Sequence, residues 1–338
     1  MSSEILIETK NLVKEFKIRT HLGKRESSIR AVDNVSITIA RGENLALVGE
    51  SGSGKSTLGR LTLGLIKPTS GTVYYKGKDI WKMSKEDFKE FRKNAQIIHQ
   101  DPYSSVNPVK TIFYTLSSPL LQHKIARNKR EAYEMVSELL RRVGLEPPSD
   151  FMNRYPSRMS GGQLQRIAIA RAISLKPKYI VADEAVSMLD ASLRLEIIDL
   201  LLDLQKEYGM SYLFITHDLG ITRYFIFKGG GKIAVMYLGS LVEYGEGEEV
   251  IRNAYHPYTR ILVEASPIPD PKLARSRGLP PLRSLDIPSL TNIPSGCKFS
   301  SRCPYAQEIC EKEIPKLRKV NDRYVACHFA EKFVKSRY

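Results

Sequence analysis

The sequence predicts an α/β fold with a mainly parallel sheet, a β-rich N-terminal part, a helical part and a small, loop-rich C-terminal extension. Three observations support this prediction. Residues 45–48, 179–182 and 212–215 form continuous apolar runs, which are typical of parallel strands buried on both faces. Segments with helical periodicity alternate with these runs, as expected when helices cover a parallel sheet. Beyond about residue 256 prolines crowd together and all four cysteines appear.

The first 75 residues indicate a β-rich opening. Residues 5–9 and 35–39 alternate between apolar and polar side chains, as half-buried strands do. We expect a polar, basic loop at residues 17–30, because that segment has no apolar period. A helix is predicted at residues 58–66, and after a Pro-Thr-Ser-Gly break residues 73–75 are predicted to form another strand.

Residues from about 85 to 171 have helical character, and we predict a helical subdomain there. Residues 131–143 place their apolar side chains on one face and end at Gly144, a typical residue after the last turn of a helix. Pro147 and Pro148 then prevent continuation.

Further helices are expected at residues 164–173 and 193–204. The predicted division is a core domain of residues 1–255 and an extension of residues 256–338, which are joined by a proline-rich connection at 267–281.

Bulk composition narrows the class of protein. Of the 338 residues, 42% are hydrophobic and 26% charged, which is ordinary for a globular protein. No apolar run approaches the roughly 18–20 residues that cross a bilayer, and residues 1–4 do not open an export signal, so we expect a cytoplasmic protein. The net charge of +15 is spread along the chain. Solubility explains it first, attraction to an anionic membrane face second, and nucleic acid last.

Residues 49–57, Gly-Glu-Ser-Gly-Ser-Gly-Lys-Ser-Thr, match the pattern G-x-x-x-x-G-K-[ST] of a phosphate-binding loop. They lie between a predicted buried strand and a predicted helix, where backbone N–H groups and the helix dipole bind anions. We expect Lys55 to contact the β- and γ-phosphates and Ser56 to bind Mg²⁺. A chance glycine-rich turn is the alternative, and the strand–loop–helix context argues against it. The predicted nucleotide-binding residues are Gly49, Ser51, Gly52, Gly54, Lys55, Ser56 and Thr57.

Two carboxylates and a histidine follow later apolar runs. Asp183 ends the run at 179–182 and is expected to bind Mg²⁺, because hard cations prefer carboxylate oxygens. Glu184 comes next and is placed to orient the attacking water or accept its proton. The alternative is that Glu184 is only a second acidic residue in contact with solvent. His217 follows the run at 212–215 and is expected to donate a hydrogen bond to the γ-phosphate.

Several motifs follow the phosphate loop in a fixed order. They are His99-Gln100-Asp101-Pro102, Ser160-Gly161-Gly162-Gln163, the pair Asp183-Glu184, Ser187-Met188-Leu189-Asp190 and Thr216-His217-Asp218. With these motifs the chain resembles the ATP-binding subunits of ABC transporters over residues 1 to about 255. The resemblance implies a P-loop NTPase core of the ABC ATPase type.

The resemblance also assigns roles that the residues alone do not. It implies that Ser160 and Gly162 contact the γ-phosphate of a nucleotide held by another subunit, so that ATP joins a head-to-tail dimer. Gln100 is similar to the residue that senses Mg²⁺ and water. Phe16 matches the aromatic residue that stacks on adenine. Gln163 and Asp190 complete the nucleotide-binding set.

Three positions depart from the family pattern. Met159 stands before Ser160 where Leu is usual, a swap that conserves volume. Ala185 and Val186 replace Pro-Thr after Glu184, which bears on how rigidly the loop holds that carboxylate. His99 stands where Phe is frequent. Since Lys55, Asp183, Glu184 and His217 are all present, we expect an active ATPase that uses ATP and Mg²⁺.

The C-terminal segment resembles the extension of the oligopeptide/dipeptide subfamily of ABC importers over most of residues 256–330. Members of that subfamily also import oligosaccharides or nickel. In a cytosolic chain Cys297, Cys303, Cys310 and Cys327 do not predict a disulfide framework. The resemblance implies that these thiols hold a [4Fe–4S] cluster, with zinc or unligated thiols as the alternatives.

The expected function is therefore that of the ATP-hydrolysing subunit of an ABC importer for peptides or a related cargo. The expected partners are a second ATPase subunit, identical or paralogous, two permease subunits and an extracytoplasmic substrate-binding protein. We expect a peripheral location on the cytoplasmic face of the membrane.

Two other functions compete with this one. A nucleic-acid-associated ABC ATPase would carry heptads between the phosphate loop and Asp183, or two such heads, and this chain has neither. A vestigial ATPase that serves a metal-cluster module is the other alternative, and the intact Glu184 and His217 argue against it.

Overall fold

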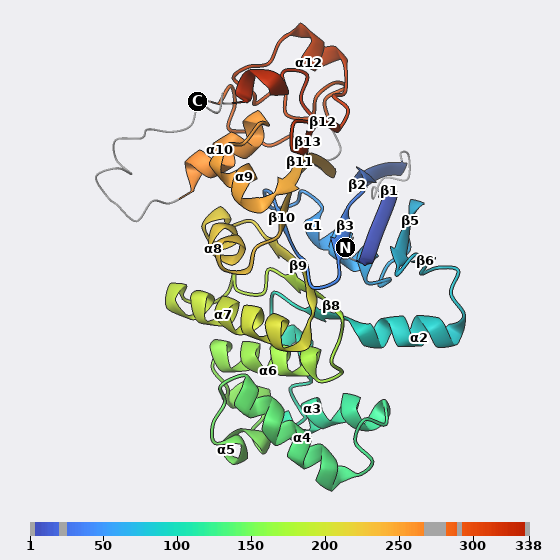
Figure 1. Cartoon of the computed structure of the whole chain (residues 1–338), viewed down its shortest axis with the longest axis vertical. Helices are drawn as coiled ribbons and strands as arrows, with labels where there is room; N and C mark the ends of the chain where they lie inside the picture. Colours follow the sequence, from blue (N-terminus) through green and yellow to red (C-terminus); the bar gives the residue numbers. More distant parts are fainter. Residues whose placement is uncertain (1–3, 20–25, 267–281, 289–292, 335–338) are drawn as a thin grey trace.

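A computed structural model describes residues 4–19, 26–266, 282–288 and 293–334 of the chain. Its described part contains two sheets and several groups of helices (Figure 1). The proline-rich connection predicted at 267–281 lies outside the described residues. The larger sheet has eight strands in this part, ordered β12 (Arg318–Val320), β13 (Arg323–Val325), β11 (Ser240–Glu246), β10 (Lys232–Tyr237), β4 (Asn44–Val48), β9 (Ser211–Thr216), β8 (Tyr179–Asp183) and β7 (Ala95–Ile98).

The middle of this sheet is parallel, as the apolar runs predict. Strand β4 pairs in parallel with β9 and β10, and β8 pairs in parallel with β7 and β9. All residues of β4, β8 and β9 are buried. Val48 lies opposite Thr216, and Asp183 lies opposite Ile215. The carboxyl ends of these strands therefore meet at one edge of the sheet, where ligands bind in open α/β folds.

Two hydrophobic cores cover the two faces of the parallel strands. Along β4, Ala46 and Val48 belong to one core, and Leu45 and Leu47 to the other, because successive side chains of a strand point to opposite faces. Helices pack their apolar faces onto both sides of the sheet and complete these cores, which explains the helical periodicity in the sequence. They are α1 (Lys55–Thr62), α2 (Lys85–Asn94), α3 (Ile112–Gln122), α4 (Lys129–Arg142), α5 (Pro148–Met152), α6 (Gly161–Ile173), α7 (Ala191–Tyr208), α8 (Leu219–Gly229), α9 (Gly247–Arg252), α10 (Pro257–Ala265) and α12 (Glu308–Lys312).

The predicted helices are found, with three differences. Helix α1 ends at Thr62 rather than at residue 66, because Gly64 adopts a left-handed conformation with φ 62°. Pro148 does more than stop α4, since it opens α5 at the position where a helix tolerates proline. Helix α2 lies outside the group of α3 to α6 to which the sequence assigned it: its Phe91 packs against Tyr75 in the core of the N-terminal sheet.

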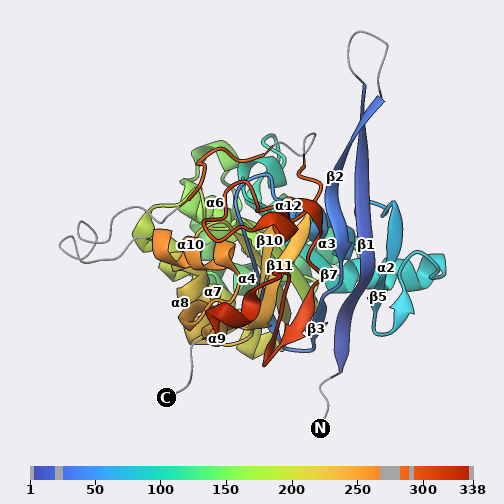
Figure 2. The same ribbon diagram turned by 90° about the horizontal axis from the view of Figure 1, so that it is seen from above.

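The second sheet confirms the β-rich opening and has five strands in the described part of the chain. Residues 35–39 are not one strand, since β2 ends at Val35 and β3 begins at Thr38. The prediction of a loop at residues 17–30 is wrong for residues 17–19 and 26–30, which belong to strands β1 and β2. Residues 20–25 lie outside the described part of the chain. Figure 2 shows β1 and β2 as a long antiparallel pair that projects from the body. The strands of this sheet are β1 (Ile5–Arg19), β2 (Glu26–Val35), β3 (Thr38–Ala40), β5 (Ser70–Tyr75) and β6 (Lys78–Asp79).

The absence of an apolar period at this pair has a physical cause. Main-chain hydrogen bonds between β1 and β2 form the ladder, with Phe16 opposite Ile29. Apolar side chains are sparse in residues 17–30, where they are Ile18, Leu22 and Ile29, so this stretch shows no sustained alternation of apolar and polar side chains.

The C-terminal extension continues the main sheet. Strand β13 pairs antiparallel with β11, and β12 pairs with β13. At this junction Arg323 and Glu243 form an ion pair at 3.5 Å, with side chains 1% and 0% exposed. Burial raises the pKa of Glu243, and hydrogen bonds from the backbone N–H groups of Tyr255 and His256 oppose that rise.

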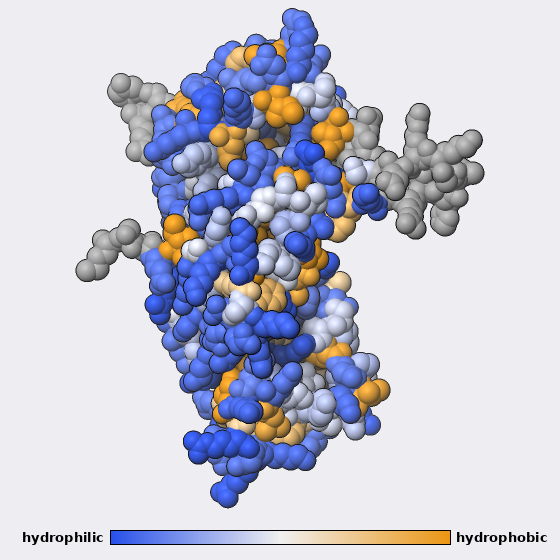
Figure 3. Space-filling view, turned by 90° about the vertical axis from the view of Figure 1, so that its right-hand side faces the viewer, coloured by the Kyte–Doolittle hydropathy of each residue, from blue (hydrophilic) through white to orange (hydrophobic). Residues whose placement is uncertain are grey.

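The surface is mostly hydrophilic, with hydrophobic side chains scattered between polar ones on the face that Figure 3 displays. Among the helices in the described residues, none is both long enough and apolar enough to cross a membrane.

Candidate functional site

The phosphate-binding loop connects β4 to α1, as the sequence predicts. Gly49 and Gly54 have φ values of 154° and 98°. A Cβ atom on Gly49 would lie 2.1 Å from the carbonyl oxygen of Met236, and one on Gly54 would lie 1.9 Å from that of Ala31. Both positions therefore need glycine, because neighbouring backbone packs against the loop and leaves no room for a side chain.

Lys55 lies inside this loop with 5% of its surface exposed. Its Nζ donates to the carbonyl oxygens of Gly49 at 2.7 Å and Glu50 at 2.9 Å. Burial lowers the pKa of Lys55, and the nearby carboxylates of Glu184 and Asp183 oppose that change. The ammonium is thus held at the base of the loop, where phosphate oxygens would meet it.

Ser56 and Asp183 come together from different elements. Ser56 begins α1 and Asp183 ends β8, and the Ser56 hydroxyl donates to Asp183 Oδ1 at 2.7 Å. Only 6% of Asp183 is exposed. A hydroxyl beside a carboxylate provides the hard oxygen donors that Mg²⁺ prefers, so this pair fits the expected cation.

Glu184 and His217 form a second pair at the same edge of the sheet. The Nδ1 of His217 lies 2.9 Å and 3.0 Å from the two carboxylate oxygens of Glu184. Because an ionised carboxylate only accepts, Nδ1 carries the proton in this contact.

The backbone of Glu184 is unusual and aims its side chain. Its φ is 52°, a left-handed value that is uncommon outside glycine. Its N–H donates to the carbonyl oxygen of Ile215 at 3.0 Å, and Ser187 Oγ donates to its carbonyl oxygen at 2.8 Å. Ala185 and Val186, which replace the family's Pro-Thr, are buried. The loop after Glu184 is therefore anchored by packing and by Ser187.

In the described part of the chain, the Ser160 segment makes no hydrogen bond to the phosphate loop and forms bonds within its own helix turn. Ser160 is the N-cap of α6, and its hydroxyl accepts from the N–H of Gln163 while the Gln163 side chain accepts from the N–H of Ser160. This capping box leaves Ser160 exposed. A Cβ on Gly162 would lie 3.1 Å from Leu193, so glycine lets the segment pack closely against α7. Met159 is buried, as the swap that conserves volume requires.

Three other predicted residues are exposed. Gln100 follows β7, and Asp190 is the N-cap of α7 without a side-chain hydrogen bond to the cap. Phe16 on β1 is 42% exposed, with the Lys14 ammonium 5.2 Å from its ring centroid. Within the described residues, neither Gln100 nor Asp190 forms a side-chain hydrogen bond with the phosphate loop.

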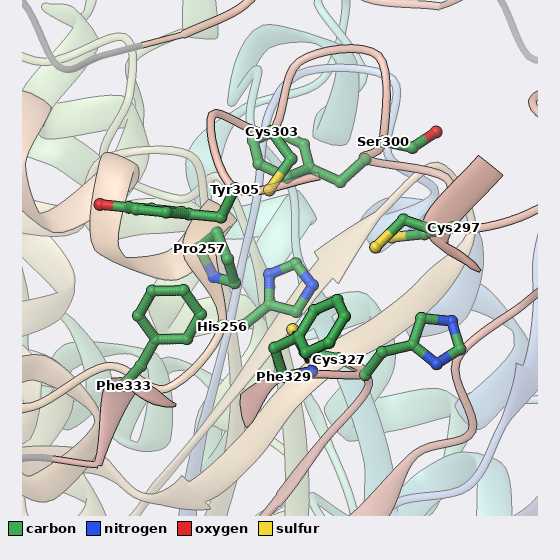
Figure 4. Close-up of a pocket in the computed structure, with 12 residues that line it drawn as sticks. His256, Pro257, Cys297, Ser300, Cys303, Tyr305, Cys327, Phe329 and Phe333 are labelled. Carbon is green, nitrogen blue, oxygen red and sulfur yellow. Dashed lines mark hydrogen bonds between the residues drawn. The ribbon is translucent and has the colours of Figure 1, made fainter. Parts of the chain in front are cut away.

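The four cysteines line one pocket in the extension. Figure 4 shows Cys297, Cys303 and Cys327 around the imidazole of His256, and Cys310 lines the same pocket. Burial raises the pKa of Cys297 to about 11 and that of Cys327 to about 12. Four thiols suit a soft metal or an iron–sulfur cluster in chemistry. Within the described residues, however, no group of three or more His, Cys, Asp or Glu side chains converges to hold a metal ion.

Sequence reasoning missed the residues behind the phosphate loop. Glu50 contacts Tyr258 of α10 and Arg302 of the extension. These partners are 208 and 252 residues away along the chain, so no local pattern indicates the contacts.

Two family matches agree with this geometry. Residues 32–187 match the ABC transporter family, and residues 242–310 match the family described as oligopeptide/dipeptide transporter, C-terminal region. The first match contains the phosphate loop, Ser160 and Glu184.

Curated relatives cover nearly the whole chain. A probable peptide ABC transporter ATP-binding protein of Sinorhizobium fredii is 44% identical over 96% of this chain and 90% of its own length. The oligopeptide transport ATP-binding protein AppF of Bacillus subtilis is 42% identical over 97% of this chain and 98% of its own length.

Among solved structures, the chain is similar to a dimeric ATP-binding cassette in a post-hydrolysis state with ADP and Pi. The TM-score is 0.62 at 30% identity, covering 71% of this chain and 98% of that one. The α/β fold and the ATP-hydrolysing character predicted from the sequence are thereby confirmed, and the comparisons do not support the nucleic-acid-associated alternative. The chain belongs to the family of ABC transporter ATP-binding subunits, with a C-terminal region of the oligopeptide/dipeptide transporter type.

Proposed function

We propose that this chain powers the import of oligopeptides or dipeptides by hydrolysing ATP at the edge where β4, β8 and β9 end. One observation carries the proposal: Lys55, the Ser56–Asp183 pair and the Glu184–His217 pair meet at this edge. The peptide cargo is supported by the matched C-terminal region and by the relatives' names, which concern peptides rather than oligosaccharides.

The residues divide the work of hydrolysis. Lys55 neutralises the β- and γ-phosphates, and Ser56 and Asp183 would hold Mg²⁺, which would supply positive charge to the phosphate oxygens. Glu184 orients the attacking water and accepts its proton, because its carboxylate is fixed by His217. Phe16 stacks on adenine, and Gln100 lies at the edge of the site.

The exposed Ser160 segment supports a dimer. Ser160 and Gln163 use their own N–H groups in the capping box, whereas the N–H groups of Gly161 and Gly162 lie outside that box and suit an anion. Within the described residues no hydrogen bond joins this segment to the phosphate loop of the same chain. We propose that a second subunit, identical or paralogous, presents its nucleotide to this segment, while Asp190 lies nearby at the start of α7. The dimer would then work with two permease subunits at the cytoplasmic face of the membrane. A substrate-binding protein would deliver the cargo.

The domain division at residue 255 stays part of this proposal. The two family matches support a division into two regions, since one ends at residue 187 and the other begins at 242, ahead of the proposed boundary. The pairing of β13 with β11 means that the extension would complete the sheet of the ATPase domain rather than fold apart from it.

The variant Glu184→Gln tests the mechanism. We expect retained ATP binding, a fall of about 10²–10⁴-fold in turnover through loss of the general base, and a dimer that accumulates with ATP. Phosphate release and size-exclusion chromatography measure these effects. The exposed Glu248→Gln on α9 is the control and should turn over normally. Unchanged turnover in Glu184→Gln would contradict the assignment.

Purification from solubilised membranes tests the transport function. Recovery of the chain with polytopic permease subunits supports the importer. Recovery with nucleic acid that survives high salt, and without permeases, would contradict it, because nonspecific contacts to phosphates weaken steeply with salt.

The cysteine pocket keeps the alternatives of a [4Fe–4S] cluster, zinc and unligated thiols. The shared pocket supports a ligand, whereas the thiols do not converge as a metal site requires. Anaerobic purification followed by visible absorption and by iron and zinc analysis distinguishes the three. The variant Cys303→Ser should lose the metal in either of the first two cases and change nothing in the third.

A further inference from the structure

The C-terminal extension contacts the phosphate-binding loop through an ion pair between Arg302 and Glu50. The two carboxylate oxygens of Glu50 accept from Nη1 and Nη2 of Arg302 at 2.8 Å and 2.9 Å. The Glu50 side chain is 23% exposed and the Arg302 side chain 6% exposed. A two-pronged contact of this kind fixes the orientation of both groups, which a single point charge would not.

Glu50 also bonds to Lys55, and so links Arg302 to the lysine of the loop. Its carbonyl oxygen accepts from Lys55 Nζ at 2.9 Å and from the N–H of Ser53 at 3.2 Å. Its own N–H donates to the hydroxyl of Tyr258 at 2.9 Å. One residue of the loop is thus bonded to the extension by its side chain and N–H, and to the phosphate-binding ammonium by its carbonyl.

Arg302 is itself held rigidly. Its guanidinium lies 5.7 Å from the ring centroid of Phe299 and 5.9 Å from that of Tyr237, and its Nη1 donates to the Tyr237 hydroxyl at 3.4 Å. Its backbone N–H donates to the carbonyl oxygen of Phe299 at 3.1 Å. The next residue, Cys303, donates to the same carbonyl at 2.9 Å. The turn that carries two of the cysteines therefore also holds the arginine.

We propose that Arg302 is a positioning residue for the phosphate-binding loop. It fixes Glu50 and, through the Glu50 carbonyl, the ammonium of Lys55, so that the extension sets the affinity of the site for nucleotide phosphates. This inference rests on the proposed ATP site at Lys55. It differs from a merely structural role, in which Arg302 would only attach the extension to the core.

Lys298 provides a matched control in the same turn. Its Nζ donates to Asp33 Oδ2 at 2.8 Å, to the Leu238 carbonyl at 2.8 Å and to Ser240 Oγ at 2.7 Å. Its side chain is 11% exposed. Lys298 therefore also attaches the extension to the core through a charged, buried group, but none of its partners belongs to the phosphate loop.

The test measures binding of Mg-ADP to the full chain by calorimetry, together with the thermal unfolding midpoint. We expect Arg302→Met to weaken ADP binding about tenfold, because a buried hydrogen bond to a charged group is lost from the loop. Lys298→Met should lower the unfolding midpoint and leave the ADP Kd within about twofold. Arg302→Lys keeps the charge but not the fork and should fall between wild type and Arg302→Met.

Glu50→Gln keeps the test decisive if Arg302→Met does not fold. This variant should also weaken ADP binding about tenfold, and adding Arg302→Met to it should cost little more, because both remove the same contact. A wild-type Kd in Glu50→Gln and in any Arg302 variant that folds would overturn the inference alone. Equal weakening in Lys298→Met would overturn it as well, because general loosening would then explain the loss. Failure of the wild-type chain to bind ADP would instead overturn the proposed ATP site.

Discussion

The two ends of the nucleotide-binding surface differ in how complete they are within one chain. At the phosphate-loop half, side chains from different elements form hydrogen-bonded pairs, and Lys55 and Asp183 are buried while His217 is exposed. At the Ser160 half, Ser160 and Gln163 form hydrogen bonds with each other within one helix turn, and Ser160 is exposed. The phosphate-loop half consists of Lys55, Ser56, Asp183, Glu184 and His217, and the Ser160 half of residues 160–163.

This difference indicates which half works alone. Buried groups act in a low-dielectric environment and are fixed before the nucleotide arrives. The N–H groups of Gly161 and Gly162, beside the exposed Ser160, gain comparable strength only when another surface covers them. The phosphate-loop half should therefore control nucleotide binding, and the Ser160 half should control turnover in an assembly.

The largest effect is expected for Lys55→Ala. The variant removes the buried ammonium, so we expect turnover to fall by about 10³-fold and ADP to bind at least about tenfold more weakly. Phosphate release and calorimetry measure the two effects. The exposed Lys206→Ala on α7 is the control. Normal ADP binding by Lys55→Ala would contradict the claim that the phosphate-loop half controls nucleotide binding.

Ser160→Arg is expected to separate turnover from binding. The larger side chain keeps the start of α6 away from the nucleotide of the second subunit, so turnover should fall about 10²-fold while the ADP Kd stays within about twofold. The same two measurements apply. A parallel loss of ADP binding would mean that both halves belong to one site within one chain.

Phe16→Ala tests whether the N-terminal sheet contributes to nucleotide binding through the Phe16 ring. Loss of stacking on adenine should weaken ADP binding about tenfold, with little change in turnover at saturating ATP. Calorimetry of ADP against a nucleotide without a purine base measures this. Equal binding of ADP by Phe16→Ala and wild type would contradict the stacking role.

Mixing Lys55→Ala with Ser160→Arg sharpens the comparison further, with the smallest difference from wild type. In a head-to-tail dimer of identical chains, each mixed dimer has one site with both defects and one intact site. Equal mixing should therefore restore about a quarter of the wild-type turnover, although each variant alone is inactive. Without any recovery, a dimer of two identical chains would be contradicted.

The parts of the fold with strong local patterns were predictable. The buried strand β4, the glycine pattern after it and the apolar face of α4 each follow from a short stretch of sequence. The hairpin of β1 and β2 was not predictable, because residues 17–30 hold few apolar side chains to mark its strands and main-chain hydrogen bonds form its ladder. Phe91 of α2 likewise gave no indication that it packs under the N-terminal sheet.

The same division applies to the site. Lys55, Ser56, Asp183, Glu184 and His217 lie in motifs whose spacing along the chain already assigns their chemistry. The hydrogen bond between Ser56 and Asp183 and the contact of His217 with Glu184 needed the sheet, which aligns the ends of β8 and β9.

The amino-acid sequence alone determined the class of chemistry, because a phosphate-binding loop and its acidic partners are encoded in short runs of residues. Only the tertiary structure decided what holds that loop in place. Glu50 meets Arg302 across 252 residues of chain, and such a contact depends on how β11, β13 and α10 pack rather than on any local pattern. Local propensities act over a few residues, whereas burial and ion pairing depend on neighbours in space.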